Sequence, residues 1–193
     1  MERIKEKYKH LLARFEVQKK NLRRLWNIPQ ETAELLYTLV LTKSPKHILE
    51  IGTSNGFSTF WLSIAAESCD AVVDTIEVDK DRFKLAKRNL KSRKNIIQRF
   101  GKAELIIPEL QDKYDFVFID AGKINYIDYI KALINLLNNN ATIVADNVIS
   151  HKDTVKEYLD FIESSEFFDS VTLNIDSGLN VAIYKADNIK IEE

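Results

Sequence analysis

Cysteine, long apolar runs and net charge are all scarce in this chain. Its 193 residues contain one cysteine, Cys69, so no intrachain disulfide can form and a cysteine-based zinc site is not expected. No apolar run approaches the roughly 20 residues that a membrane-spanning helix needs. The formal net charge is only −1, which argues against a chain that binds partners through overall charge. Because the N-terminus is charged from Glu2 onward, we expect no signal peptide and a cytoplasmic protein.

The rest of the composition is that of an ordinary soluble domain. Hydrophobic residues make up 45% and charged residues 30% of the sequence, and a chain of this length can bury a sizeable core. The sequence contains no internal repeat, low-complexity tract or interdomain linker. We therefore expect one domain over residues 1–193, with a basic helical arm at 1–27 and a core at 28–193.

The N-terminal arm is basic. Residues 1–26 hold nine Lys and Arg against three Glu, so the remainder of the chain is acidic. Apolar residues recur in the arm at helical spacing, which predicts an amphipathic helix or helix pair. These residues are Ile4, Tyr8, Leu11, Leu12, Phe15, Leu22 and Leu25. The favoured interpretation is a helix that caps the core or forms a dimer contact, and the alternative is a basic arm, residues 3–24, that contacts RNA or another anionic substrate.

Beyond the arm, helical and extended patterns alternate. A helix is expected at 30–42, where a proline precedes the first turn. The expected strands are 47–51, 71–78, 95–100, 114–120 and 141–146. The expected helices are one that ends at residue 66 and those at 80–92, 103–110, 126–137 and 152–164. This alternation predicts an α/β fold with a parallel sheet and helices on both faces.

The pattern changes at the end of the chain. Two further strands, 170–175 and 180–186, are joined only by residues 176–179. This link is too short for a helical crossover, so the pair must be antiparallel. A sheet that ends in such a hairpin argues against a standard dinucleotide dehydrogenase.

Polar side chains follow two of the predicted strands at the point where each strand ends. Asp120 follows the apolar run 116–119, and Asp146 and Asn147 follow the run 143–145. Two neighbouring parallel strands would bring these oxygen ligands to one edge of the sheet, and such ligands suit Mg²⁺. Lys123 is close enough to Asp120 to act as a base beside the metal. Helix capping is the alternative role for each Asp alone, but the presence of all three ligands favours a metal.

A glycine loop follows the first predicted strand and begins a helix. Gly52 allows a sharp turn and Gly56 allows close packing, but their G-x-x-x-G spacing is not the G-x-G-x-x-G of dinucleotide sites. Glu77 ends the next strand, where a carboxylate can accept both hydroxyls of a ribose. A helix cap or solvated strand end is the alternative role for Glu77. Its position 27 residues after Glu50 favours ligand binding.

Three segments of the chain resemble the cation-dependent O-methyltransferase family, which includes catechol and caffeoyl-CoA O-methyltransferases. They are residues 49–58, 118–126 and 144–148, of which the second and third are the more specific. The resemblance extends from about residue 28 to residue 186. It implies the Rossmann-like class I methyltransferase fold, a seven-stranded, mostly parallel sheet with a C-terminal antiparallel hairpin and helices on both faces.

The resemblance also implies roles for individual residues. The methionine end of S-adenosylmethionine would be held by Glu50, Gly52 and Ser58. Glu77 would hold the ribose, and Ala103 would contact the adenine. The implied cofactor set is Glu50, Gly52, Ser58, Glu77, Ala103 and Asp120, the metal set is Asp120, Asp146 and Asn147, and the base is Lys123.

The chain departs from the family pattern in places that bear on the substrate. Residues 138–140 are three asparagines where the family usually has Pro-Gly-Gly, a change that affects a turn because Asn tolerates left-handed backbone. Lys102 stands where an acid is common, and residues 149–152 replace a more apolar, glycine-rich stretch. The acceptor-contacting carboxylate of the catechol enzyme has no counterpart. The last two differences, in residues 149–152 and in the missing carboxylate, leave the acceptor open but not the reaction.

We therefore expect an O-methyltransferase that uses S-adenosylmethionine and Mg²⁺, or another divalent cation, on a small molecule with vicinal or phenolic hydroxyls. A homodimer without membrane contact is expected. One alternative is the same chemistry on a hydroxylated uridine in tRNA, which the basic arm favours slightly. Another is a non-catalytic protein that binds S-adenosylmethionine, which the complete set of metal and base residues argues against. A nicotinamide oxidoreductase is least expected.

Overall fold

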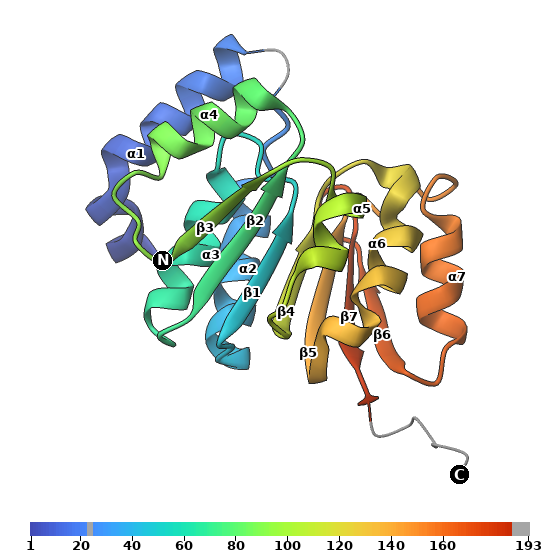
Figure 1. Ribbon diagram of the computed structural model, residues 1–193. Coiled ribbons are helices and arrows are strands. Elements are labelled where there is room, and N and C mark those ends of the chain that lie inside the picture. The colour runs from blue at the N-terminus through green and yellow to red at the C-terminus, as the bar shows by residue number, and fades with distance from the viewer. Residues whose placement is uncertain (23–24, 187–193) are drawn as a thin grey trace.

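The computed structural model describes residues 1–22 and 25–186, and these form an α/β fold (Figure 1). Arg23 and Arg24 of the predicted basic arm lie outside the described residues. The strands are β1 (His47–Ile51), β2 (Val72–Glu77), β3 (Ile96–Phe100), β4 (Tyr114–Ile119), β5 (Leu137–Asp146), β6 (Phe168–Leu173) and β7 (Leu179–Tyr184). The α-helices are α1 (Glu2–Asn21), α2 (Gln30–Lys43), α3 (Phe57–Glu67), α4 (Lys80–Asn89), α5 (Ala103–Ile106), α6 (Tyr126–Leu133) and α7 (Lys156–Ser164). Short 3₁₀ turns are η1 (Ile107–Glu109), η2 (Lys123–Asn125) and η3 (Ile134–Leu136).

The strands form one seven-stranded sheet in the order β3-β2-β1-β4-β5-β7-β6. The pairs from β3 to β5 are parallel, whereas β7 is antiparallel to both β5 and β6. The mostly parallel sheet and its C-terminal antiparallel hairpin confirm the predicted fold class. Because β1, β4 and β5 are parallel neighbours, their carboxyl ends lie at one edge of the sheet, where ligands bind in open α/β folds.

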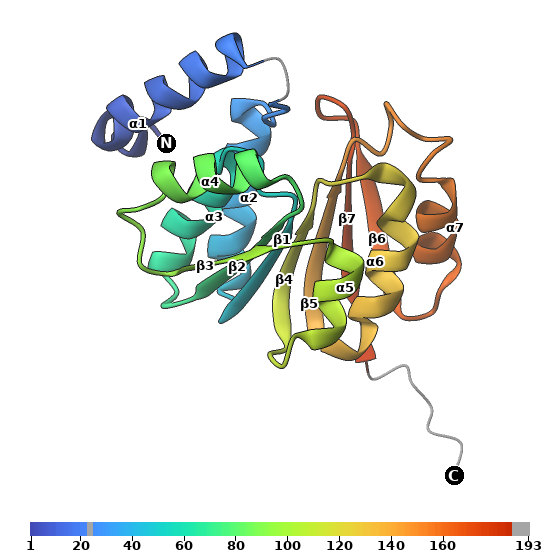
Figure 2. The same ribbon diagram turned by 45° about the horizontal axis from the view of Figure 1, so that its top comes forward.

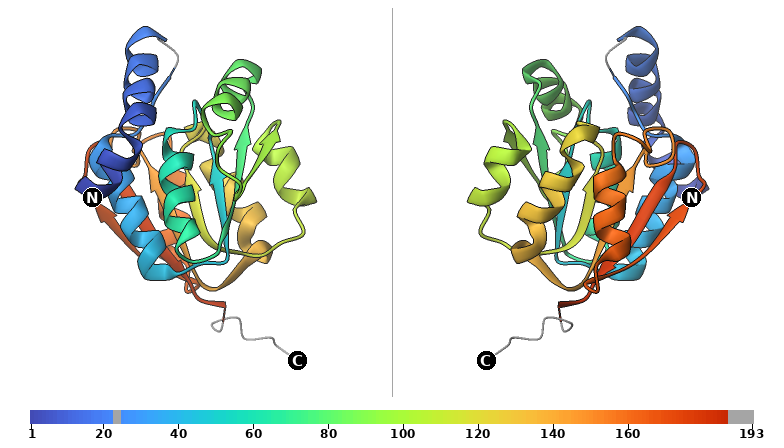
Figure 3. Two further views of the ribbon diagram at one scale, coloured as in Figure 1. Left: turned by 90° about the vertical axis from the view of Figure 1, so that its left-hand side faces the viewer. Right: turned by 90° about the vertical axis from the view of Figure 1, so that its right-hand side faces the viewer.

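Helices cover both faces of the sheet, as predicted (Figure 3). One apolar core lies between the sheet and α5, α6 and α7, and the other lies under α1, α2 and α3. The central strands are buried from both sides, with Val117 and Phe118 both fully buried on β4. This explains why the strands read as continuous apolar runs in the sequence. Within the described residues, no helix is both long and apolar enough to span a membrane.

The N-terminal helix α1 caps the core beside α4, on the same side of the sheet (Figures 1 and 2). The Tyr8 ring packs edge-on against Phe60 at 5.1 Å, and the buried Phe15 packs against Phe57 at 5.5 Å between ring centroids. The helix is kinked at Tyr8, where φ is −112° and ψ is 16°. The apolar face of α1 is therefore used inside the molecule, and its basic face is turned outward.

Several predicted boundaries differ from the observed ones, and the largest shifts of a starting residue are those of the last helix and of β5. The last helix begins at Lys156 rather than at residue 152, because residues 148–155 form turns that bond to the β6–β7 connection. Strand β5 begins at Leu137 rather than at residue 141, with a register irregularity opposite Tyr114 and Phe116. Asn140 takes up this irregularity with a left-handed φ of 63°, which an asparagine tolerates better than most residues.

Candidate active site

The ends of β4 and β5 bring the three predicted metal ligands to one place. Ile119 pairs with Ala145 across the parallel strands, so Asp120 and Asp146 are the next residues on adjacent strands, which run about 4.8 Å apart. Asn147 follows directly, with a left-handed φ of 62°. The hydroxyl of the buried Tyr126 lies 3.2 Å from the carbonyl oxygens at the ends of both strands. Tyr126 therefore links the two strand ends beneath the carboxylates.

Asp146 is the more buried of the two carboxylates. Its side chain is almost inaccessible to solvent, and burial followed by the negative charge of Asp120 raises its pKa to about 7. The backbone N–H of Asn147 donates to Asp146 Oδ1 at 2.7 Å and opposes that shift. Two carboxylates that repel each other at a buried sheet edge are stabilised by a bound cation.

Lys123 supplies the positive charge nearest to these carboxylates. Its Nζ lies 2.7 Å from Asp120 Oδ1, and both side chains are mostly shielded, with 17% and 16% of their surfaces exposed. The ammonium also lies 5.6 Å from the centroid of the Tyr126 ring. The 3₁₀ turn η2 begins at Lys123 and holds its side chain over the end of β4. The predicted base is therefore placed beside the predicted metal ligands.

Glu50, in β1, is a fully buried carboxylate. Its Oε2 accepts hydrogen bonds from the hydroxyls of Thr59 and Thr75, the latter at 2.6 Å. Its Oε1 is also buried, yet it has no hydrogen-bond partner within the described part of the chain. Burial raises the pKa of Glu50 to about 7, and the hydroxyls of Ser58, Thr59 and Thr75 moderate that rise. An unpartnered buried carboxylate oxygen fits a cationic donor from a ligand.

Gly52 is required by the contact between the β1 loop and the end of β4. Its φ is +106°, and a Cβ atom built there would lie 2.0 Å from the Asp120 backbone oxygen. A side chain at this position is therefore excluded on steric and conformational grounds. This close approach connects the glycine loop to the residue that bears the first predicted metal ligand.

Glu77, at the end of β2, holds the glycine loop in place. Its buried carboxylate accepts from the backbone N–H groups of Ser54 at 2.7 Å and Asp79 at 2.8 Å. The Nε of Arg82 lies 3.4 Å from the same carboxylate. The predicted ribose ligand thus lies at the end of β2, next to the glycine loop. It also has a structural role, because it accepts hydrogen bonds from the backbone of that loop and of the turn before α4.

The other two predicted cofactor residues are nearly buried and lie at helix starts along the same edge. Ser58 is in the first turn of α3 with 8% of its surface exposed, and Ala103 is the first residue of α5 with 6% exposed. Asp120 follows β4, which is the neighbour of β1 in the sheet order on the side away from β3. The structure therefore places the whole predicted cofactor set on the carboxyl-terminal side of β1, β2, β3 and β4.

A cluster of three amides near the glycine loop was missed in the sequence. Gln18 Oε1 accepts from Asn55 Nδ2 at 3.1 Å and from Asn89 Nδ2 at 2.9 Å. Asn89 Nδ2 also donates to the Asn55 backbone oxygen at 2.8 Å. This cluster joins α1, the glycine loop and α4. No periodicity marks these residues, because their partners are 34 to 71 positions away.

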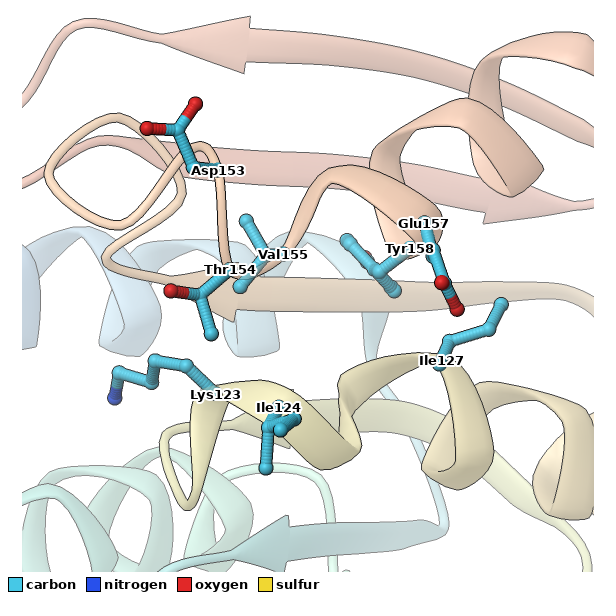
Figure 4. Close-up of a pocket in the computed structure, with 8 residues that line it drawn as sticks. All are labelled: Lys123, Ile124, Ile127, Asp153, Thr154, Val155, Glu157 and Tyr158. Atoms are coloured by element: carbon cyan, nitrogen blue, oxygen red, sulfur yellow. The ribbon is translucent and has the colours of Figure 1, made fainter.

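The segment after Asn147 forms one wall near the strand ends. The backbone N–H groups of Val148 and Ile149 donate to Gly178 and Ser177 in the β6–β7 connection at 3.0 and 3.1 Å. Further along, a small cavity of about 130 Å³ lies between η2, α6 and the start of α7 (Figure 4). In Figure 4 the Lys123 side chain and the Thr154 hydroxyl extend toward the same end of this cavity. His151 is exposed, with its Nδ1 2.9 Å from the Ser150 hydroxyl.

No cluster of three or more His, Cys, Asp or Glu side chains suited to a metal occurs in the described residues. The candidate set instead has two carboxylates and one amide, Asp120, Asp146 and Asn147. All three supply oxygen, which is the ligand type of Mg²⁺ and Ca²⁺ rather than of zinc or copper. A set of this size leaves coordination positions for water or a substrate oxygen.

A comparison with protein families assigns the chain to one of them. A family model described as O-methyltransferase matches residues 3–175, most of the chain. The chain belongs to the O-methyltransferase family. The family resemblance stated for the sequence is therefore confirmed.

Individual relatives agree with this assignment. A catechol O-methyltransferase of Niastella koreensis is 32% identical over 130 residues, which are 64% of this chain and 58% of that protein. One from Mycobacterium tuberculosis is 40% identical over 109 residues, which are 54% of this chain and 49% of that protein. The chain thus spans about half the length of these curated relatives. The crystal structure of an O-methyltransferase from Bacillus cereus in complex with SAH shares the fold, with a TM-score of 0.81, 23% identity and coverage of 91% of this chain and 90% of that one.

Proposed function

We propose that this protein transfers a methyl group from S-adenosylmethionine to a hydroxyl of a small molecule with vicinal or phenolic hydroxyls, with the help of a divalent cation. The observation that carries the proposal is the meeting of an oxygen ligand set, Asp120, Asp146 and Asn147, with Lys123 at the sheet edge that also bears Glu50. The membership in the O-methyltransferase family and the catechol O-methyltransferases among the relatives support this choice of reaction and acceptor.

The residues fit S-adenosylmethionine at two points. The unpartnered Oε1 of Glu50 is suited to accept from the ammonium of the methionine end. Glu77 retains acceptor capacity for ribose hydroxyls, since each of its oxygens accepts one backbone N–H. Gly52 allows the loop after β1 to lie directly against the Asp120 backbone.

The residues also fit a hard divalent cation. Asp120, Asp146 and Asn147 would hold it. Burial, and then the negative charge of Asp120, raises the pKa of Asp146, and a cation beside these two carboxylates would favour their ionised forms. When bound, such a cation lowers the pKa of an acceptor hydroxyl and fixes its orientation.

When bound, S-adenosylmethionine would supply an electrophilic methyl group for an in-line displacement: the acceptor oxygen would bond to the methyl carbon as the carbon–sulfur bond breaks, with the electron pair left on sulfur. The acceptor proton would pass to Lys123, whose Nζ lies 2.7 Å from Asp120 Oδ1. A phenol has a pKa of about 10, so it needs this assistance at neutral pH.

A second candidate acceptor is RNA. The observation that favours it is the basic outward face of α1 and α4, described below. In that case the chemistry at the strand ends is unchanged, and only the acceptor is larger. A non-catalytic binding protein accounts less well for the placement of Lys123 beside the carboxylates.

The proposal is tested by methyl transfer from labelled S-adenosylmethionine to catechol, with Mg²⁺ or with a chelator. We expect product only with Mg²⁺, and loss of product in Asp146→Ala. The matched control is Asp128→Ala, which removes an exposed carboxylate from α6 and is expected to retain activity. Lys123→Met is expected to lower the rate while S-adenosylmethionine binding persists. Product that forms equally with chelator, or in Asp146→Ala, would contradict the metal-dependent mechanism.

A further inference from the structure

A basic groove lies between α1 and the end of α4, away from the candidate active site. Its volume is about 300 Å³, and half of its lining side chains are cationic or titratable bases. The lining residues are Lys7, Tyr8, His10, Leu11, Arg14, Asn89, Lys91 and Ser92. No acidic side chain lines it. A groove of this composition is suited to an anionic ligand.

The cations of this groove are not neutralised inside the protein. Within the described part of the chain, none of Lys7, His10, Arg14 and Lys91 makes an ion pair, whereas the neighbouring Lys9 pairs with Glu6. Lysine and arginine side chains are cationic at neutral pH, so Lys7, Arg14 and Lys91 bring three positive charges to the groove. Unpaired cations that gather at one groove repel each other, and a bound anion relieves this repulsion.

The basic surface continues from the groove along α4. Residues 84–94 contain six Lys and Arg and no Asp or Glu, although the whole chain has a net charge of −1. The side chains of Lys84, Lys87 and Arg88 are exposed between the groove and the start of the helix. A helix of ten residues is about 15 Å long, so this basic strip is long enough to contact successive phosphates of a polymer rather than a single anion.

The strip leads toward the cofactor end of the molecule. At the start of α4, Arg82 lies 3.4 Å from Glu77, the predicted ribose ligand. The same Arg82 lies 5.7 Å from the ring centroid of Trp26, whose surface is 71% exposed. An exposed aromatic ring beside a guanidinium is a stacking surface for a base.

We propose that the α1–α4 groove and the strip along α4 bind the phosphodiester backbone of a nucleic acid. The exposed ring of Trp26 at the far end of the basic strip favours a nucleic acid over an acidic protein. A membrane surface is disfavoured because the apolar face of α1 already packs on α3 through Phe15 and Phe60. The binding does not depend on the chemistry proposed at Asp120 and Asp146.

The test is fluorescence anisotropy of the full chain with a labelled 20-nucleotide RNA, at several salt concentrations. Wild type is expected to bind, with affinity that falls as salt rises. The double variant Arg14→Glu, Lys91→Glu is expected to bind at least about tenfold more weakly, with a salt slope smaller by about two. The matched control, Lys113→Glu with Lys131→Glu, changes the net charge equally at exposed sites outside the groove and is expected to stay within about twofold of wild type.

Further measurements separate the alternatives. Thermal unfolding checks that all variants are folded, and Arg14→Gln with Lys91→Gln gives a milder loss by the same mechanism. Methylation of catechol by the charge-reversed variant, Arg14→Glu with Lys91→Glu, is expected to be unchanged. Failure of the groove proposal is therefore distinguishable from failure of the proposed reaction. The proposal is overturned if wild type does not bind RNA, if both double variants lose affinity equally, or if polyglutamate or phosphatidylglycerol vesicles bind as tightly as RNA. A DNA oligonucleotide that binds equally well supports backbone recognition.

Discussion

The buried carboxylate of Glu50 predicts a pH dependence of cofactor binding. In the free protein, burial raises the pKa of Glu50 to about 7, and Oε1 has no partner in the described residues. A cationic ammonium at Oε1 binds the ionised carboxylate and not the neutral acid. The affinity for S-adenosylmethionine should therefore increase as the pH rises through 7, because a growing fraction of the free protein already has the ionised carboxylate that the ammonium binds.

The size of the effect follows from the ionised fraction of Glu50. With a pKa of about 7, the carboxylate is roughly one-tenth ionised at pH 6 and three-quarters ionised at pH 7.5. An α-amino group with a pKa of about 7.7–8.0 remains mostly charged over this range. We expect binding to be roughly fivefold tighter at pH 7.5 than at pH 6. Glu50→Gln should lose a charge-assisted hydrogen bond, which corresponds to roughly 10- to 100-fold weaker binding.

The assay is calorimetric titration of S-adenosylmethionine into the metal-free protein at pH 6, 6.5, 7 and 7.5. Glu50→Gln is expected to bind weakly and without the pH dependence. Glu163→Gln, which changes an exposed carboxylate in α7, serves as the matched control and should retain the wild-type profile. A wild-type affinity that is flat over this range, or a Glu50→Gln variant that keeps the same slope, would refute the assignment of Glu50 to the ammonium.

The remaining predictions concern stability and the metal ligands. The folded-state pKa of Glu50 lies above its usual value of 4.5. The unfolding free energy of the cofactor-free protein should therefore fall by up to about 3 kcal/mol as the pH rises from 5 to 8. Urea titrations should show a smaller fall in the Glu50→Gln variant. Gly52→Ala should destabilise the protein by about 3 kcal/mol or more, because its Cβ would meet the Asp120 oxygen; an unchanged urea midpoint would disprove this. Tyr126→Phe should cost about 1 kcal/mol and weaken Mn²⁺ binding by loosening the strand ends, whereas equal Mn²⁺ affinity would show that the hydroxyl does not position the ligands. Asp146→Asn should abolish Mn²⁺ binding measured by electron paramagnetic resonance but leave S-adenosylmethionine binding within about threefold, since the amide keeps the shape and loses the charge.

Much of the fold was predictable because the central strands are buried on both faces. Apolar runs of this kind, each followed by a polar residue, mark both a strand and its end. The antiparallel hairpin followed from the shortness of its connection. The same logic placed Asp120 and Asp146 together, since adjacent parallel strands end at one edge.

The features that could not be predicted depend on contacts between distant segments. The predicted start of α7 is wrong because residues 148–150 donate hydrogen bonds to Ser177 and Gly178, and the spacing of apolar residues does not reveal such bonds. The amide cluster of Gln18, Asn55 and Asn89 has no signature at the level of spacing. The steric reason for Gly52 appears only when the end of β4 is placed against it.

The basic groove illustrates a different limit. The excess of Lys and Arg in residues 1–26 is visible in the sequence, but three of the eight residues that line the groove, Asn89, Lys91 and Ser92, come from the end of α4 and the turn after it. Only the packing of α1 beside α4 shows that the two basic segments form one surface. Charge counts within a segment therefore indicate a function less well than charges summed over neighbouring helices.

The central claim is metal-dependent methyl transfer to a hydroxyl, and one competition experiment tests it most directly. The protein is given S-adenosylmethionine with a labelled methyl group, equal amounts of catechol and unmodified tRNA, and either Mg²⁺ or a chelator, and the label in each product is counted. We predict that Mg²⁺ places label on catechol and that the chelator abolishes it. Label that appears on neither acceptor in the presence of Mg²⁺, or equally on catechol in both conditions, would contradict the account.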